Sequence, residues 1–529
     1  MLNGAGTMEI SRCLEAIRSL PGGSSRFHAL PLHASLTPSE QRRVFPAAPE
    51  GLRKIIAATN VAETSITIED VVCVVDTGRV KETSFDIANN VVKLQEVWAS
   101  RAAAKQRRGR AGRVRAGQCY KLYTKATEAH KMPERPEPEL KRVPLEQTCL
   151  SVKAMGIKDV RAFLAAAISP PNTVAVEGAL ALLEKMGAVV DGELSALGRH
   201  MSMIPADLRC SKLMVYGVLF GCLSPALTIA AILTTRSPFT FRTDARDDSK
   251  KSRVRFSGSQ GDLLADCRAW EQWSEQRNAL SHRELRQWCQ GNFLDAQVMV
   301  DIASNRSQYI DSLRDIGFVP YGSRSQLPTE LDRNGDNDIL IRALIAGAFT
   351  PQIARIQMPE QKFASSSSGA LAIDPEAKTI KYFTHDSGRV FVHPSSTVFE
   401  AQSFPGNAGF MAFFGKMATS KVFVRDCTRP SPPPHRLRSA NQRDLAAVNT
   451  YSLLLLGGKV EVDMLGRGIT IDGWVRLRGW GRIGVLVRRL RAMLDSALDG
   501  MIDSPNTALQ HGHDEVVTCV IGLIAGDGT

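Results

Sequence analysis

The first 125 residues alternate helical patterns with short runs that are rich in β-branched residues. Two of these runs, KIIAAT at 54–59 and VVCVVDTG at 71–78, are apolar almost throughout instead of alternating with polar residues. Such runs are typical of strands that helices cover on both faces. The pattern therefore predicts an α/β domain with a mostly parallel sheet.

Beyond residue 125 the pattern turns helical, through a proline-rich, charged connector, MPERPEPELKRVP. The segment GAVVDGELSALG interrupts the helices and predicts a small hairpin with its turn at Asp191 and Gly192. A charge-free run at 213–235 is long enough to span a bilayer, but Ser224 and Pro225 divide it into two shorter pieces. We therefore expect two buried helices there, and no membrane partner.

After residue 320, strand patterns such as TIKYF, RVFVHP and KVFVRD return between turn residues, as in a small barrel. The stretch 428–449 is proline-rich and basic and has no apolar period, so we expect a disordered insertion. Near the end, RIGVLVRRLRAMLDSALDGMI predicts an amphipathic helix that packs on the barrel.

Composition adds expectations about partners and compartment. The 529 residues exceed what one core accommodates, so several domains are expected. A net charge of +12, from 66 Lys and Arg against 54 Asp and Glu, favours a polyanionic partner. The ten cysteines form no C-x-x-C pair and no cluster with histidine at zinc spacing, which argues against a metal site or disulfide framework. Reduced thiols and the lack of a signal-peptide pattern indicate a cytoplasmic protein, or alternatively a nuclear one.

The loop TNVAETSITIED, residues 59–70, follows a predicted strand and carries many polar groups. In an open α/β sheet, ligands bind at the carboxyl ends of the strands, where this loop begins. Asn60 and Glu63 are spaced as a helix cap and its capping-box partner, as in an ordinary capped loop. Such a loop leaves further polar residues free to face a ligand: Thr59, Ser65, Thr67 and Glu69.

A second polar stretch, RAAAKQRRGRAGRVR at 101–115, contains seven cations and no acid. Such a run is often a solvated face or a nucleic-acid patch. On a helix, however, Gln106, Arg110 and Arg113 project from one side, and the glycines between them allow close backbone approach. Two guanidiniums beside an amide suit a polyphosphate, because each guanidinium can donate to two oxygens at once.

Together, TNVAETSITIE and QRRGRAGR resemble motifs V and VI of the DEAH-type RNA helicases of superfamily 2, with DTGRVKE between them as in that family. The resemblance continues through PLHASLTPSEQRRVF, GQCYKLYT, RVPLEQTCLSVKAMGI, CLSPALTIAAILTTRSPF and VFVHPSST. It implies a multidomain fold with an N-terminally truncated, α/β second RecA-like domain (1–125), a winged helix (126–205), a helical ratchet domain (206–318), an OB-like β-barrel (319–427), the disordered insertion (428–449), and the end of the barrel with a C-terminal helix (450–529).

The resemblance also implies roles for individual residues. These are Phe45 stacking on the nucleotide base, Glu69 binding the ribose, Ser65 and Thr67 sensing the nucleotide state, Gln106, Arg110 and Arg113 acting catalytically on the β- and γ-phosphates, and Thr59 and Asn60 holding RNA phosphates. A hairpin at 80–97 would separate nucleic-acid strands. The implied cofactor is ATP, with Mg²⁺ held mainly by a first RecA-like domain. The implied partners are that domain, an activator protein, and RNA that is single-stranded or a duplex with an overhang.

The sequence contains no phosphate loop of the form G-x-x-x-x-G-K-[ST] and no DEAH. In the family, both belong to the first RecA-like domain, which holds the nucleotide and metal. We therefore expect this chain by itself to hydrolyse no ATP. The alternative is a non-catalytic RNA-binding protein that uses the winged helix, ratchet and barrel without turnover.

Overall fold

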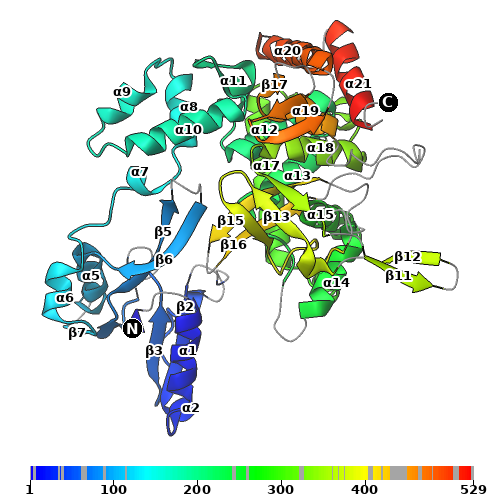
Figure 1. Cartoon of the computed structure of the whole chain (residues 1–529). Coiled ribbons are helices and arrows are strands. Elements are labelled where there is room, and N and C mark those ends of the chain that lie inside the picture. The colour runs from blue at the N-terminus through cyan, green and yellow to red at the C-terminus, as the bar shows by residue number, and fades with distance from the viewer. Residues whose placement is uncertain are drawn as a thin grey trace. The chain divides into compact units, whose positions relative to one another are not determined.

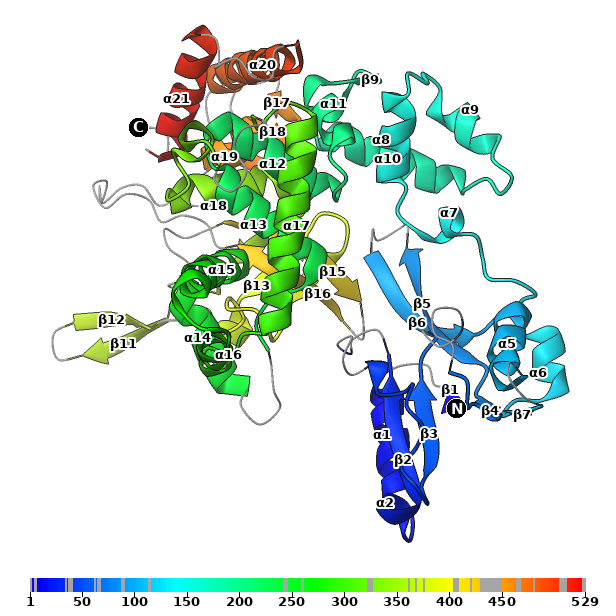
Figure 2. The same ribbon diagram turned by 180° about the vertical axis from the view of Figure 1, so that it is seen from behind.

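The computed structural model contains two compact units, residues 1–86 with 92–143 and residues 87–91 with 144–529. Figure 1 shows the chain from one side and Figure 2 from behind. The structure describes residues 2–3, 7–33, 36, 41–60, 63, 68–86, 91–112, 116–240, 246–257, 261–320, 327–359, 362–366, 369–373, 376–402, 409–418, 421–428, 450–462, 468–478, 481–503 and 511–525. The predicted insertion lies almost wholly outside the described residues.

The first unit is built on a five-stranded sheet with the order β2-β3-β1-β4-β7, and every neighbouring pair is parallel. The strands are β1 (Leu2–Asn3), β2 (Phe27–Leu32), β3 (Arg53–Ala58), β4 (Cys73–Asp76) and β7 (Gln118–Lys121). The two apolar runs of the sequence become β3 and β4. The prediction of an α/β domain with a parallel sheet is therefore confirmed.

Helices cover this sheet and complete its core. Helix α1 lies against β2 and β3, where Ile10 and Leu14 pack on Ala57. A second cluster joins the ends of β2 and β3 to the segments that follow them: Leu30, Leu32, Val44, Ile56, Ala58 and Ile68. The helices of the unit are α1 (Thr7–Arg18), α2 (Gly23–Arg26), α5 (Arg101–Arg108), the 3₁₀ helix η1 (Gly109–Gly112), α6 (Lys125–His130) and α7 (Glu139–Arg142).

The hairpin expected at 80–97 is present as strands β5 (Arg79–Asp86) and β6 (Val91–Trp98), which are neighbours in one sheet. Residues 87–90, which connect them, lie outside the described part of the chain.

The second unit begins with a helical region that carries a small hairpin. Its elements are α8 (Glu146–Ala154), α9 (Val160–Ala165), α10 (Thr173–Lys185), β8 (Val189–Val190), β9 (Glu193–Leu194) and α11 (Ala196–Met203). Between the two strands, Asp191 has φ 50° and Gly192 has φ 81°. Positive φ at both central residues is what a tight type I′ hairpin turn requires, so the predicted turn is confirmed.

The charge-free run forms two buried helices, α12 (Leu208–Phe220) and α13 (Leu223–Thr235). The break falls at Gly221, which caps α12 with φ 66°, and not at Ser224 and Pro225 as the sequence suggested. Pro225 instead lies in the first turn of α13, where a missing N–H leaves no helical bond unmade. In the part of the chain that the structure describes, no helix is both long and apolar enough to cross a membrane.

Four further helices complete the helical region. They are α14 (Arg246–Ser257), α15 (Asp262–Ala279), α16 (His282–Gly291) and α17 (Ala296–Asp315). Both α15 and α17 contact α13. The 3₁₀ helix η2 (Thr329–Asp332) and helix α18 (Asp338–Phe349) then lead into the strands.

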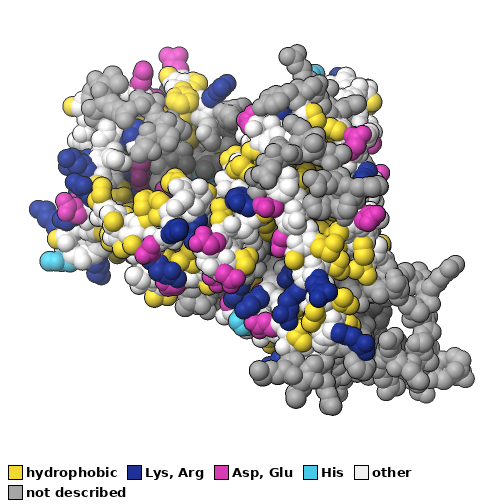
Figure 3. All heavy atoms as spheres, turned by 90° about the horizontal axis from the view of Figure 1, so that it is seen from above, with side chains coloured by type: hydrophobic (Ala, Val, Ile, Leu, Met, Phe, Trp, Pro, Cys, Tyr) yellow, Lys and Arg dark blue, Asp and Glu magenta, His cyan; other side chains and the backbone are white. Residues whose placement is uncertain are grey.

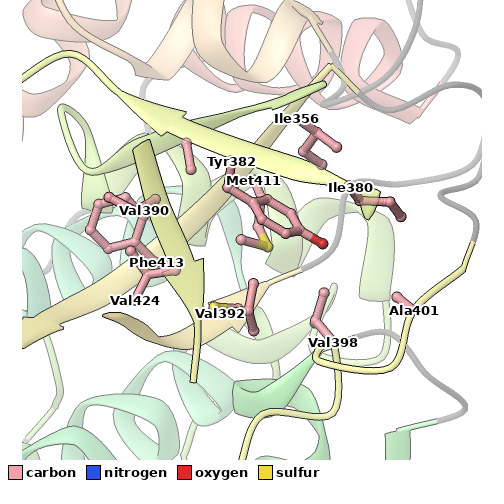
Figure 4. Close-up of a cluster of buried hydrophobic side chains, with 12 residues drawn as sticks. Ile356, Ile380, Tyr382, Val390, Val392, Val398, Ala401, Met411, Phe413 and Val424 are labelled. Carbon is pink, nitrogen blue, oxygen red and sulfur yellow. The ribbon is translucent and has the colours of Figure 1, made fainter. Parts of the chain in front are cut away.

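A five-stranded barrel follows, with the order β10-β13-β14-β16-β15, closed by pairing of β10 with β15. Its strands are β10 (Ile353–Gln357), β13 (Lys381–Thr384), β14 (Gly388–Val392), β15 (Phe410–Ala418) and β16 (Val422–Thr428). Figure 4 shows side chains from these strands converging inside, among them Tyr382, Val392, Met411 and Phe413. A separate hairpin, β11 (Lys362–Ser366) and β12 (Gly369–Ile373), and the 3₁₀ helix η3 (Ala377–Thr379) lie between β10 and β13 along the chain.

The C-terminal region differs from the expectation in how it packs. It forms helix α19 (Thr450–Leu456), a separate three-stranded sheet of β17 (Val460–Val462), β18 (Gly468–Ile471) and β19 (Val475–Arg478), and helices α20 (Gly481–Asp503) and α21 (His511–Ala525). The barrel is already closed by five strands, so residues 450–529 are not its end. The predicted amphipathic helix, α20, packs on α11 and this small sheet instead of the barrel.

Candidate functional site

The polar loop after β3 begins at the carboxyl edge of the parallel sheet. The Thr59 amide donates to the Leu32 carbonyl at the end of β2, with an N···O distance of 3.0 Å. The Glu63 amide donates to the Asn60 carbonyl at 2.9 Å. Because parallel strands all end at one edge, this loop lies where α/β sheets bind ligands.

Arg107, on α5, ties this loop to the rest of the edge. Its side chain is 2% exposed. Its Nε donates to Glu63 Oε1 at 2.5 Å, and one terminal nitrogen donates to Asp76 Oδ1 at 3.0 Å and to the Arg79 carbonyl at 3.1 Å. Burial opposes the charge of Arg107, but the two carboxylates more than offset it, so the pKa of the guanidinium is raised. A permanent buried cation thus joins α5 to two segments that are distant in sequence.

Asp76, the last residue of β4, is the second centre of this network. One carboxylate oxygen also accepts from the Gly78 amide at 2.9 Å, and the other accepts from the Tyr123 hydroxyl at 3.3 Å. Burial and the Asp76 charge raise the pKa of Tyr123. Gly78 has φ 68°, and a Cβ there would lie 2.7 Å from the Tyr123 ring, so the turn requires glycine.

The cationic run is one α-helix only as far as Arg108, after which η1 continues as a tighter 3₁₀ turn. The Ser100 hydroxyl caps α5 by accepting from the Ala103 amide at 3.1 Å. A 3₁₀ turn advances by about 120° per residue against about 100° in an α-helix, so Gln106 and Arg110 are not one helical turn apart. The prediction of a single α-helical face is therefore corrected. Glycine at 109 weakens α-helix continuation at this point.

An arginine that contacts phosphates is expected to be accessible, but the burial of the residues in this segment differs from that expectation. Gln106 is exposed, whereas Arg110 is only 8% exposed, and its guanidinium donates to the Glu63 carbonyl. Arg113 lies outside the described residues. Glu63 is therefore held through its side chain by Arg107 and through its carbonyl by Arg110.

The remaining predicted residues lie in the segments that precede and follow β3 in the chain. Phe45 is 48% exposed, Glu69 and Asn60 are exposed, and Thr59 is half-buried. Ser65 and Thr67 lie outside the described residues. The suggested capping box is not formed, because the Glu63 carboxylate binds Arg107, which is the stronger, charged donor.

Sequence reasoning missed Arg107 and Asp76, although both left a signal. Asp76 ends a buried apolar strand, and a carboxylate placed there needs a cation. The run at 101–115 offered seven cations, and only the fold shows which of them turns inward. Within the described residues, no three His, Cys, Asp or Glu side chains gather closely enough to hold a metal ion.

Comparisons with known proteins identify the families that this chain resembles. Four family profiles match, and the first covers strands β2, β3 and β4 of the parallel sheet with their loops: the helicase conserved C-terminal domain (7–115), the ratchet-like helicase-associated domain (207–292), the oligonucleotide/oligosaccharide-binding fold (341–434) and the C-terminal domain of RNA helicases (467–526). Their order along the chain confirms the multidomain fold expected from the sequence.

Individual relatives match along nearly all of the chain. A provisionally named DEAH-box ATP-dependent helicase of Mycosarcoma maydis is 40% identical over 98% of this chain and 34% of its own length. A provisionally named ATP-dependent RNA helicase of Schizosaccharomyces pombe is 36% identical over 99% of the chain and 38% of its own length. An ATP-dependent DNA/RNA helicase of Homo sapiens is 34% identical over 91% of this chain and 45% of its own length. The chain thus spans less than half the length of these relatives.

Proposed function

Because this chain belongs to the DEAH-type helicases, whose C-terminal domains it carries, we propose that it forms the second half of an ATP-dependent RNA helicase. In this role the first unit would close one side of a nucleotide site, and a first RecA-like domain would supply the other side with the phosphate loop and most of the Mg²⁺ ligands. Hydrolysis would then move the chain along RNA.

The observation that carries this proposal is the Arg107 network. It brings the loop after β3 and the end of α5, 44 residues apart at Glu63 and Arg107, to the carboxyl edge of the sheet. A structural ion pair alone would not require exposed ligand-type groups beside it. Here Gln106, Asn60 and Glu69 are all exposed. The residues present therefore fit a nucleotide, because they offer an amide, a carboxylate and nearby guanidiniums.

Within this site we assign the base to the exposed Phe45 ring and the ribose hydroxyls to the Glu69 carboxylate. Arg110 and Arg113, with Gln106, would bind the β- and γ-phosphates. Arg110 would exchange the neutral Glu63 carbonyl for a phosphate oxygen, and charge-assisted hydrogen bonds of this kind are roughly twice as strong as neutral ones. Ser65 and Thr67 would respond to the presence of the γ-phosphate. ATP supplies the phosphoryl group whose growing negative charge the guanidiniums stabilise.

RNA is the proposed track, in single-stranded form or as a duplex with an overhang. Thr59 and Asn60 would hold its phosphates, and the β5–β6 hairpin would separate strands. The net charge of +12 and the closed barrel, which matches the oligonucleotide-binding family, support this partner. Figure 3 shows Lys and Arg side chains lying among Asp and Glu side chains on the coloured part of one face. We further propose an activator protein and a cytoplasmic location, with the nucleus as the alternative.

The test uses a full-length enzyme in which this chain follows a first RecA-like domain. Arg110→Ala and Arg113→Ala should each lower the RNA-stimulated ATPase rate by about 10³-fold, because an arginine that stabilises phosphoryl transfer contributes at least that much. RNA affinity should stay within about twofold, since neither group is proposed to touch RNA. Equal losses of RNA affinity and ATPase rate would instead favour a non-catalytic RNA-binding patch.

A further inference from the structure

Lys54, near the start of β3, has three partners for its ammonium group: two in the loop before β3 and one in the turn at residues 69–70. Its Nζ donates to the Val44 carbonyl at 2.9 Å and to the Pro46 carbonyl at 2.7 Å. Its third partner is the Asp70 carboxylate, with an N···O distance of 2.7 Å. The side chain is 7% exposed, so the charge is enclosed by these acceptors.

The two carbonyls flank Phe45 on both sides. Val44 is fully buried in the core cluster of the first unit, whereas the Phe45 ring is 48% exposed. The residue before a proline is restricted to extended conformations, and the Phe45 amide is held by the Arg42 carbonyl at 3.2 Å. The backbone around Phe45 is thus held from the interior while its ring faces outward. Packing restrains a half-exposed ring less than a buried one, so the backbone contributes more to the orientation of Phe45.

The third contact reaches the turn that carries Glu69. Asp70 is 38% exposed, and Glu69 before it is exposed. One buried ammonium therefore joins the loop that presents Phe45 to the turn that presents Glu69. These two segments are 24 residues apart in the chain, at Phe45 and Glu69.

We propose that Lys54 is a positioning residue for nucleotide binding, which sets the distance between the ring that stacks on the base and the carboxylate that binds the ribose. This inference rests on the proposed function of Phe45 and Glu69. Lys54 itself does not touch the nucleotide, because its three donors are occupied. Binding of the base and ribose is shared by the ground state and the transition state, so Lys54 should affect KM far more than kcat.

A purely structural role would have a different signature. It would lower the stability of the whole sheet and reduce kcat and the affinity for RNA together. A positioning role acts through Phe45, so its effect should vanish once the ring has been removed. The double-mutant cycle between positions 54 and 45 therefore separates the two explanations.

The experiment uses Lys54→Met, which keeps the length of the side chain and removes its donors. In the full-length enzyme, Lys54→Met should raise the KM for ATP about tenfold and leave kcat within about twofold. The double variant Lys54→Met/Phe45→Ala should have the KM of Phe45→Ala alone. The matched control is Lys121→Met on β7, which removes an ion pair to Glu128 in the same unit and should leave KM unchanged.

Hydrogen exchange in the 529-residue chain gives a readout that does not depend on nucleotide. Lys54→Met should speed exchange of the Phe45 amide at least tenfold, while amides of α1 stay protected. Additive effects of the two substitutions on KM, or unchanged exchange at Phe45, would overturn the role of Lys54. If Phe45→Ala alone left the KM for ATP unchanged, the proposed contact of Phe45 with the base would be wrong. Faster exchange of the Phe45 amide in Lys54→Met would still show that Lys54 holds the backbone around Phe45.

Discussion

Two buried arginines, Arg107 in the first unit and Arg253 in the second, make networks of similar chemistry in different surroundings. Arg253, on α14, is 3% exposed and binds both carboxylate oxygens of Asp266 on α15, at 2.7 and 2.9 Å. It also donates to the Ser395 carbonyl at 3.2 Å. Its neighbour Asp262 accepts from the backbone amides of Thr397 at 2.7 Å and Cys427 at 3.0 Å. This network joins two helices to the barrel.

The difference lies in what adjoins each network. The carboxylate partners of Arg253, Asp262 and Asp266, are each 1% exposed, so these carboxylates are not available to a ligand. Arg107 is equally buried, but exposed polar residues lie close to this network in the chain: Gln106 precedes Arg107, and Asn60 lies three residues before its partner Glu63. A buried charge pair by itself therefore does not mark a functional site. Exposed groups that the buried pair holds in place are the more useful sign.

The largest expected effect tests the structural side of the comparison. Arg253→Met should lower the free energy of unfolding of the second unit by about 3–5 kcal/mol, because removing one partner leaves buried carboxylates without a counter-charge. Equilibrium unfolding in guanidinium chloride measures it. Arg161→Met, which removes an exposed pair with Glu177, is the control and should change nothing measurable. Equal stability of Arg253→Met and wild type would show that the network is not structural.

The next effect tests the functional side. In the full-length enzyme, Arg107→Met should lower the RNA-stimulated ATPase rate by about 100-fold, because the loop after β3 and the η1 segment lose their shared anchor, and misplacement of catalytic groups by about 1 Å has this consequence. The unfolding transition of the second unit should not move. The neighbouring exposed cation gives the control, Arg108→Met, for which we expect a change of less than about threefold. A lower stability of the first unit with an unchanged rate would make Arg107 a counterpart of Arg253.

The smallest effect concerns a buried ionisable group that lacks a carboxylate partner. His200, on α11, is 1% exposed, and its Nε2 lies 2.9 Å from the Leu498 carbonyl on α20. Burial lowers the pKa of His200, partly opposed by this hydrogen bond. The folded state therefore resists a proton that the unfolded chain takes up below about pH 6.5, so stability should fall as pH decreases from 7.5 to 5.5.

The slope from one such proton is at most about 1.4 kcal/mol per pH unit. Thermal unfolding of wild type and His200→Gln across this range measures it, and the variant should show the weaker dependence on pH. Identical pH profiles would mean that the contact between α11 and α20 tolerates the imidazolium. The distinction between structural and functional buried charges would then apply to the two arginine networks only.

Much of this protein was decided by local sequence. The apolar runs determined β3 and β4 because a strand buried on both faces leaves no room for polar residues. The Asp191-Gly192 pair determined the hairpin turn, since few residues other than glycine, asparagine and aspartate accept positive φ. The motifs in TNVAETSITIE and QRRGRAGR indicated the family, because the spacing of their polar groups reflects a ligand.

Other features depended on contacts between segments far apart in the chain, and only the tertiary structure decided them. Seven cations compete in the run at 101–115, and Arg107 is the one opposite Asp76 once β4 and α5 have packed together. Helix α20 has an amphipathic sequence that does not name its partner, and only the tertiary structure shows that it packs on α11 and the small sheet instead of the barrel. Lys54 resembles any strand lysine in sequence. Its three acceptors meet only after the fold brings residues 44, 46 and 70 around one buried ammonium, where each unmade bond would be costly.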